Sequence, residues 1–238
     1  MQHNVDSTVK IAMEQGLLSL VYQPIRCLES GEISAVEALM RLRMLDGVEV
    51  PPQQFIPVAE KTGGIIQLGY WAIREACRKL LTNADLPLVS VNVSPVQLRE
   101  PSFADEVGAI LSEAGIRGGR LAFEITEGQR VEARSVELHC ICRLQALGIA
   151  IWLDDFGTGF AGLALLRLVD FDLVKIDRSF LYASSSKRGH VMLRNIVRLI
   201  KDHGPETLVE GIESASHLEL ARALQVRHVQ GFLIGRPA

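Results

Sequence analysis

The stretch RLAFEITEGQRVEARSVELHCICRLQALGIAIWLDDF, residues 120–156, contains two short apolar runs separated by an amphipathic segment. The runs, residues 120–126 and 149–156, are rich in side chains that favour β-strands. Between them, residues 134–147 show helical spacing. The apolar side chains on one side of this segment are Val136, Ile141, Leu144 and Leu147. The order strand, helix, strand predicts a parallel β-α-β unit.

The same alternation continues through most of the chain. Further segments of helical period cover residues 191–200 and 217–224. The other strand-like runs are residues 18–25, 32–39, 86–93, 171–177, 206–213 and 227–232. Eight such runs in a chain of 238 residues favour an α/β fold closed as a (β/α)8 barrel. An open, doubly wound sheet remains the structural alternative.

The barrel is expected to start irregularly. Only six residues, including the turn pair Ser30-Gly31, separate the runs at 18–25 and 32–39. A parallel crossover needs a dozen or more residues, so these two strands must form an antiparallel hairpin. Because no linker-like stretch follows, we expect one domain over residues 1–238, with residues 1–16 as a helical lead-in.

Composition narrows the possible functions. The formal charge of −3 argues against a protein that binds a nucleic-acid polymer or an anionic membrane through bulk charge. Four cysteines in a chain of this length do not form a disulfide framework. We find neither a signal peptide nor an apolar run long enough to span a bilayer. The expected location is therefore the cytoplasm.

Polar residues interrupt or end the apolar runs at intervals of about one strand–helix unit. In a parallel barrel, these positions lie on one rim, where active sites are found. The residues placed there are Glu37, Asn92, Glu124, Asp154, Asp155, Lys175, Glu210 and Gln230.

Five carboxylates on one rim would repel one another. At ~5 Å and an effective dielectric of ~20, each pair costs on the order of 3 kcal/mol. Bound cations remove this repulsion, and an all-oxygen ligand set with one Asn amide suits Mg2+ or Mn2+. The neighbours Asp154 and Asp155 can serve two ions, which indicates a two-metal centre for phosphoester hydrolysis.

Eight short motifs along the chain resemble those of the EAL-domain cyclic di-GMP phosphodiesterases. The resemblance runs from about Leu18 to the C-terminus, and its specificity comes from the order and spacing of the motifs. The motifs are YQPI (22–25), EALMR (37–41), SVNVS (90–94), EITE (124–127), DDFGTG (154–159), KID (175–177), EGIE (210–213) and QGF (230–232).

The resemblance implies a TIM-like barrel that hydrolyses cyclic di-GMP to linear pGpG with two divalent cations, Mg2+ or Mn2+. One ion would be held by Glu37, Asn92, Glu124 and Asp154. The other would be held by Asp154, Asp155 and Glu210. The implied catalytic set consists of Lys175 and the carboxylates of Glu37, Asp154, Asp155 and Glu210.

The same resemblance implies roles around this centre. Lys175 would orient or help to deprotonate the attacking water, and a lysine among cations is expected to have a lowered pKa. Gln23 and Arg41 would contact the substrate, and Gln230 would support the second metal and the substrate side of the site. Glu127 would anchor the loop of residues 155–162.

The chain departs from the family pattern at three places. Leu42 replaces a tryptophan, which we expect to remove an aromatic ring near the substrate. Phe160-Ala161-Gly162 replaces Tyr-Ser-Ser, which affects the expected loop dynamics and dimer coupling. Family members also usually continue about ten residues beyond the pair Arg236-Pro237, so a closing helix is expected to be missing.

Two other functions remain open at this point. The chain could be a cyclic di-GMP receptor without activity, although none of the expected metal ligands is lost. It could also be a protein-binding module, which would be expected to lose Arg41 and Gln23. The resemblance further implies a homodimer, attached to sensor or GGDEF-type domains in a longer protein. No nucleic-acid polymer or membrane is expected as a partner.

Overall fold

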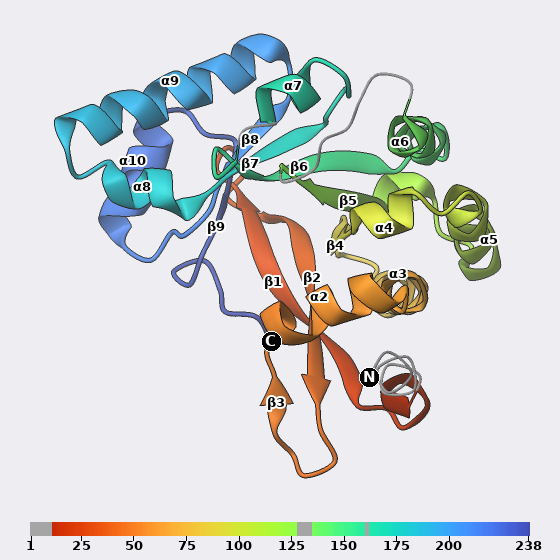
Figure 1. Cartoon of the computed structure of the whole chain (residues 1–238). Coiled ribbons are helices and arrows are strands. Elements are labelled where there is room, and N and C mark those ends of the chain that lie inside the picture. Colours follow the sequence, from red (N-terminus) through yellow and green to blue (C-terminus); the bar gives the residue numbers. More distant parts are fainter. Residues whose placement is uncertain (1–10, 128–134, 160–161) are drawn as a thin grey trace.

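The computed structural model describes residues 11–127, 135–159 and 162–238. In this part of the chain, nine strands form one sheet, and eight of them close into a barrel (Figure 1). The strands are β1 (Leu18–Cys27), β2 (Ile33–Arg43), β3 (Glu49–Val50), β4 (Val89–Asn92), β5 (Leu121–Thr126), β6 (Ala150–Phe156), β7 (Leu173–Ile176), β8 (Glu206–Val209) and β9 (His228–Gln230).

The barrel closes through β1. Strands β2 and β4 to β9 run parallel to one another, whereas β1 is antiparallel to both β2 and β9. The predicted (β/α)8 barrel with an antiparallel first strand is therefore confirmed, and the open sheet is excluded. Strand β2 also extends to Arg43, beyond the run predicted at 32–39, and the short strand β3 pairs with this extension.

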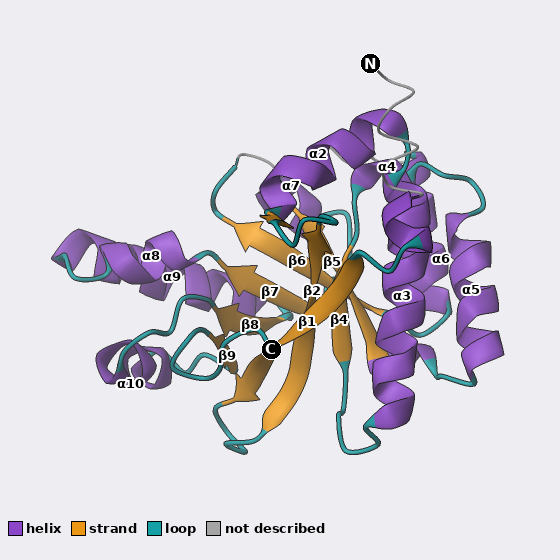
Figure 2. Cartoon of the chain, turned by 90° about the horizontal axis from the view of Figure 1, so that it is seen from below, coloured by secondary structure: helices purple, strands orange, loops and turns teal. Residues whose placement is uncertain are grey.

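Helices cover the outside of the barrel. Figure 2 shows α3, α5 and α6 along one side and α8, α9 and α10 along another. The helical segments are α2 (Pro52–Thr62), α3 (Ile65–Thr82), α4 (Pro95–Leu98), α5 (Phe103–Ala114), the 3-10 turn η1 (Gly118–Arg120), α6 (Val136–Ala146), α7 (Gly162–Leu166), α8 (Arg178–Ala183), α9 (Lys187–His203) and α10 (Ala215–Ala223).

The three helical periods read from the sequence correspond to α6, α9 and α10. Helix α9 is longer at both ends than the predicted 191–200. The Ser186 hydroxyl accepts a hydrogen bond from the Gly189 amide and starts the helix, and Gly204, with φ 119°, ends it. The capping residues therefore determine where α9 begins and ends, whereas the helical spacing of its apolar residues indicated only the middle of the helix.

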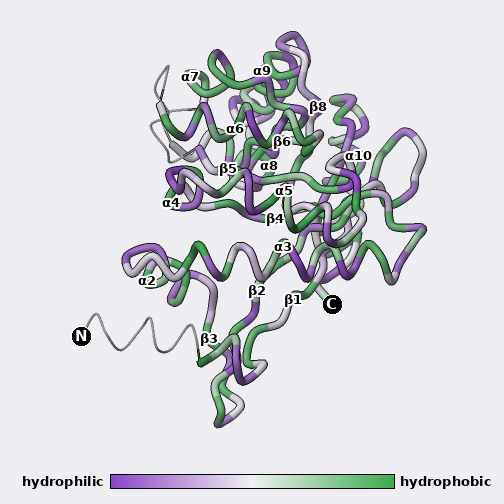
Figure 3. Tube along the Cα trace, turned by 90° about the vertical axis from the view of Figure 1, so that its right-hand side faces the viewer, coloured by the Kyte–Doolittle hydropathy of each residue, from purple (hydrophilic) through white to green (hydrophobic). Residues whose placement is uncertain are grey.

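The main core lies between the barrel and its helices. Phe123 of β5 packs against Phe103 of α5, with ring centroids 6.4 Å apart. Hydrophobic and hydrophilic residues alternate along the outer helices, as expected for elements with one buried face (Figure 3). A second, smaller apolar layer fills the barrel interior. It consists of Ile25, Ala35, Ala122, Trp152, Leu173 and Leu208, so Trp152 is a packing residue, as predicted.

Of the predicted lead-in at residues 1–16, residues 11–14 are helical, and residues 1–10 lie outside the described part. No helix among the described residues is both long and apolar enough to cross a membrane.

Candidate active site

The polar residues of the site form a layer above the apolar floor of the barrel. Side chains of a strand alternate between its two faces, so residues two positions apart point the same way. Each member of the polar layer lies two residues further along the chain than a residue of the apolar floor, toward the carboxyl end of the strand or just beyond it. These members are Glu37, Glu124, Asp154, Lys175 and Glu210. The packing of the apolar floor inside the barrel therefore determines where these polar side chains come together.

Lys175 lies at the centre of this layer. Its Nζ atom lies 2.6 Å from Glu124 Oε2, 3.0 Å from Asp154 Oδ1, 3.0 Å from Glu210 Oε1 and 3.3 Å from Glu37 Oε2. Burial alone would lower the pKa of Lys175, but the four carboxylates outweigh it and raise this pKa well above its usual value. The protein groups alone therefore hold Lys175 charged, whereas a lowered pKa was expected for a lysine among cations.

Two amide side chains fix Glu37. Asn92 Nδ2 donates to Glu37 Oε1 at 3.1 Å, and Gln230 Nε2 donates to Glu37 Oε2 at 2.7 Å. Burial works to raise the pKa of Glu37, but Lys175 and these two donors overcome it and lower the pKa. Glu37 is therefore ionised and held in one orientation.

The carboxyl groups of Glu124, which is buried, and Glu210, which is half-buried, ionise less readily than usual. Burial is the main cause that raises the pKa of Glu124 well above its usual value, and Glu37 and Asp154 add to it. Burial likewise raises the pKa of Glu210 to about 7. Among the described residues, Glu124 Oε1 is buried without a hydrogen-bond partner. Both observations mark a place where further positive charge would be favourable.

A bulge in β6 lets two adjacent aspartates reach the same site. Between the pairs Leu153↔Val174 and Phe156↔Ile176, β6 contains one residue more than β7. Asp155 takes up this extra residue with φ 54°, a left-handed conformation that Asp tolerates better than most side chains. As a result, carboxylate oxygens of Asp154, Asp155 and Glu210 all lie within 4.8 Å of one another.

The donor set fits divalent cations. Five carboxylates surround one ammonium, which leaves four excess negative charges when all are ionised, the charge that two divalent cations neutralise. All donors are oxygens apart from the lysine, as hard cations prefer. The unpartnered Glu124 Oε1 supplies a further buried ligand atom.

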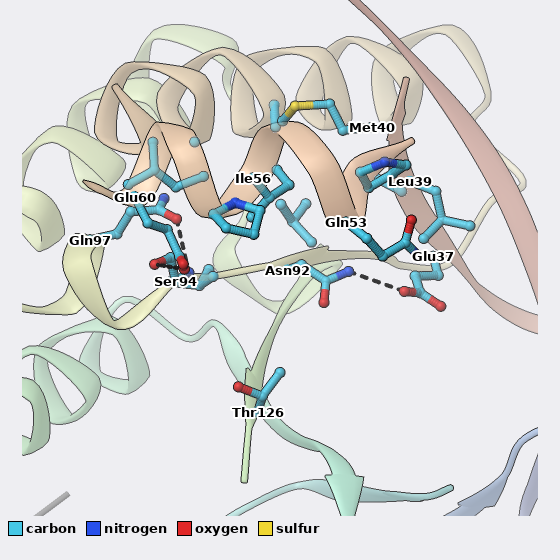
Figure 4. A pocket seen from close by; sticks show the side chains of 18 of the residues that line it. Glu37, Leu39, Met40, Gln53, Ile56, Glu60, Asn92, Ser94, Gln97 and Thr126 are labelled. Atoms are coloured by element: carbon cyan, nitrogen blue, oxygen red, sulfur yellow. Dashed lines mark hydrogen bonds between the residues drawn. The ribbon is translucent and has the colours of Figure 1, made fainter. Parts of the chain in front are cut away.

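A cavity of about 480 Å³ opens beside this layer. Figure 4 shows Glu37 and Asn92 at one end of it and Glu60, Ser94 and Gln97 at the other. Asp155 also lines it, together with Arg41, which is the one positively charged side chain among the described lining residues. Arg41 is therefore the lining side chain that could pair with an anionic group of a ligand in this cavity.

Gln23 lies behind the Glu37 end of the site. Gln230 Nε2 donates to Gln23 Oε1 at 3.3 Å as well as to Glu37. Gln23 Nε2 in turn donates to the Gly235 carbonyl at 3.3 Å. The C-terminal segment thus supports Gln23, and through Gln230 it supports Glu37.

Leu42 follows Arg41 in β2 but has different surroundings. It is buried in a small apolar cluster with Leu18 and Leu68, and it does not line the cavity that Arg41 lines. Residues 41 and 42 point to opposite faces of β2, so a side chain at position 42 faces this cluster. Leu42 therefore lies outside this cavity, and the expectation that an aromatic ring near the substrate is lost there stays a prediction.

Glu127 holds the chain that follows β6. It is buried, and its Oε2 accepts a hydrogen bond from the Gly157 amide. A Cβ atom on Gly162 would lie 3.0 Å from the Glu127 carboxyl carbon, so the glycine allows this close approach. Phe160 and Ala161 of the divergent loop segment lie outside the described residues.

Some residues in the cavity and next to it were missed by the sequence reasoning. Ser94 Oγ donates to Glu60 Oε1 at 2.6 Å, and Ser94 also caps α4 in a capping box with Gln97. The spacing Ser-x-x-Gln at 94–97 was a readable signal for this cap. Glu49 of β3, which contacts Arg41, had no signal, because a strand of two residues shows no period.

Comparison with known proteins places this geometry in a family. Residues 6–237 match the EAL domain family. The chain is 35% identical over 236 residues to the oxygen sensor protein DosP of Escherichia coli, and 34% identical over 238 residues to the cyclic di-GMP phosphodiesterase NbdA of Pseudomonas aeruginosa. These alignments cover 97% and 98% of this chain but only 30% of each relative.

Among solved structures, the PaMucR phosphodiesterase in complex with c-di-GMP is similar over nearly its whole length. The TM-score is 0.89 at 32% identity, with 98% of this chain and 97% of that chain covered. The similarity therefore extends over the whole barrel, while the curated relatives contain much more chain than this barrel.

Proposed function

The chain belongs to the EAL domain family, and from this premise we propose that it hydrolyses cyclic di-GMP to linear pGpG with two divalent cations, Mg2+ or Mn2+. The observation that carries the proposal is the set of carboxylates around Lys175, with four of them within 3.3 Å of its ammonium group. Relatives of this family include the phosphodiesterase NbdA.

The proposed ligand sets are those that the family resemblance implies, and the close approach of Asp154, Asp155 and Glu210 supports one of them. Asp154, Asp155 and Glu210, whose oxygens lie within 4.8 Å of one another, would hold one cation. Glu37, Asn92 and Glu124 would hold the other and share Asp154 with the first. When bound, such cations activate water and stabilise the leaving oxygen of a phosphoester.

The chain's own groups would position the reactants. Lys175 would orient the water and hold a proton near the phosphorus, and Arg41 would contact the phosphate through its planar fork. Gln23 and Gln230, linked by a hydrogen bond, would fix the other side of the substrate. The water oxygen bonds to phosphorus, the P–O3′ bond breaks, and the freed 3′ oxygen takes a proton.

A timed assay tests this function. Purified chain is incubated with cyclic di-GMP and Mn2+ or Mg2+, and pGpG is quantified by chromatography. We expect metal-dependent product that Glu37→Ala or Asp154→Ala abolishes, while Glu219→Ala, an exposed change on α10, leaves it unchanged. If the chain binds cyclic di-GMP but leaves it intact over hours, it is a receptor and not a phosphodiesterase.

We also propose that this domain acts in the cytoplasm, as a homodimer, within a longer regulatory protein. The support for the longer protein is that the chain spans about three tenths of the length of its curated relatives, one of which is an oxygen sensor protein. Light scattering on the purified chain at micromolar concentration tests the dimer.

A further inference from the structure

The cationic side chain of the cavity is held by a residue outside it. Arg41 Nε lies 3.4 Å from Glu49 Oε1, and Arg41 Nη1 donates to the Met40 carbonyl at 2.9 Å. The Arg41 side chain is 25% exposed and the Glu49 side chain 52% exposed. Among the described residues, Arg41 is therefore held by one carboxylate, that of Glu49, and by one backbone carbonyl, that of Met40.

Strand β3 places Glu49 for this contact. In the β2–β3 hairpin, which extends away from the barrel in Figures 1 and 3, Glu49 is paired directly with Arg43. Its carboxylate nevertheless contacts Arg41, which lies on the same face of β2 two residues earlier. The diagonal contact directs the charge of Glu49 toward the cavity.

The contacts leave a usable part of the guanidinium free. Of the five N–H donors of Arg41, the Met40 carbonyl accepts one from Nη1, and Glu49 forms an ion pair with Nε. The Nη2 amino group and one N–H of Nη1 remain, and together they form the end of the planar fork. Two parallel N–H groups in this arrangement match two oxygens of a phosphate.

We propose that Glu49 is a positioning residue for the substrate, acting through Arg41. By holding Nε, Glu49 keeps the free end of the guanidinium directed at the phosphate of the dinucleotide. The inference rests on the proposed function, because it assigns a role in binding the same substrate. Glu49 itself need not touch the substrate.

The expected effect is modest, since the ion pair is partly exposed. Exposed pairs contribute little, so Glu49→Gln should raise the KM for cyclic di-GMP about two- to fivefold with kcat little changed. Arg41→Ala removes the phosphate contact itself and should raise KM about ten- to a hundredfold. In the Arg41→Ala background, Glu49→Gln should have no further effect, because its target is gone.

The experiment measures KM, kcat and the Kd for cyclic di-GMP for wild type, Glu49→Gln, Arg41→Ala and the double variant. Glu32→Gln is the matched control, since it removes the same charge from the exposed turn at the other end of β2. Equal effects of Glu49→Gln with and without Arg41 would overturn the inference. So would a lower KM in Glu49→Gln, which would mean that Glu49 competes with the substrate for Arg41.

Failure of this inference can be told apart from failure of the function. If wild type hydrolyses cyclic di-GMP and Glu49→Gln matches it in KM, only the role of Glu49 is wrong. If wild type binds without hydrolysis, the Kd series tests Glu49 while the enzyme assignment fails. If wild type neither binds nor hydrolyses the dinucleotide, both proposals fail.

Discussion

Lys175 Nζ and Glu124 Oε2 lie 2.6 Å apart inside the barrel, with only 1% and 0% of the two side chains exposed. A buried pair of this kind contributes little net stability, but the loss of one partner leaves the other charge buried and unpaired. Lys175 therefore supports the carboxylate cluster structurally as well as serving the proposed reaction.

Lys175→Met should destabilise the protein by about 3–5 kcal/mol in EDTA, because it leaves four carboxylates without their cation. Urea denaturation followed by circular dichroism measures this loss. The double variant Lys175→Met with Glu124→Gln should recover part of it, since one uncompensated charge is removed. Equal stability of Lys175→Met and wild type would show that the cluster does not depend on the lysine.

Glu210 makes the metal-free protein sensitive to pH. Its pKa is raised from 4.5 to about 7, with burial as the main cause. Between these values the folded chain binds a proton that the unfolded chain has released, so the free energy of unfolding should fall as pH rises from 4.5 to 7. Urea midpoints in EDTA measure it, and Glu210→Gln should flatten this part of the profile. An unchanged slope in Glu210→Gln would contradict the assignment.

Two substitutions at Asp155, in the bulge of β6, test separately the backbone conformation and the negative charge of this residue. Asn accepts a positive φ about as well as Asp, so Asp155→Asn should keep the stability while it lowers hydrolysis at least a hundredfold by removing a metal ligand. Asp155→Ala should lose as much activity and about 1 kcal/mol of stability in addition, from the strained backbone. Thermal melts and the pGpG assay compare the two variants. If Asp155→Asn retains full activity, its carboxylate is not a ligand.

The role of Glu127 in ordering the loop can be tested by removing the oxygen that accepts the hydrogen bond from the Gly157 amide. Glu127→Gln keeps an oxygen for the Gly157 amide and should retain most of the activity. Glu127→Ala removes the acceptor, leaves that amide unpaired and should lower kcat/KM at least tenfold, with about 1–3 kcal/mol of lost stability. Steady-state kinetics with Mn2+ distinguish the two. Equal kcat/KM in both variants would mean that the hydrogen bond does not order the loop.

Much of the fold and of the site could be predicted from where polar residues occur in apolar strands. The period of two explains this success, because Glu124 and Lys175 each follow a floor residue, Ala122 and Leu173, by two positions. The hairpin of β1 and β2 was likewise dictated by the short connection between them.

Other features depend on three-dimensional contacts that one sequence does not display. The bulge at Asp155 is a relation between the registers of two strands, and the pKa of Lys175 depends on four carboxylates from β2, β5, β6 and the residue after β8. The surroundings of Leu42 were not visible in the sequence for a similar reason. Its neighbour Arg41 lines the cavity, whereas Leu42 packs in a separate apolar cluster with Leu18 and Leu68.

The central claim is that the carboxylates around Lys175 hold two divalent cations. Anomalous diffraction at the manganese edge, from crystals grown with Mn2+ and cyclic di-GMP, tests this most directly. We expect two peaks, one among Asp154, Asp155 and Glu210 and the other among Glu37, Asn92, Glu124 and Asp154. An empty cluster at saturating Mn2+, or manganese bound only elsewhere on the protein, would contradict it.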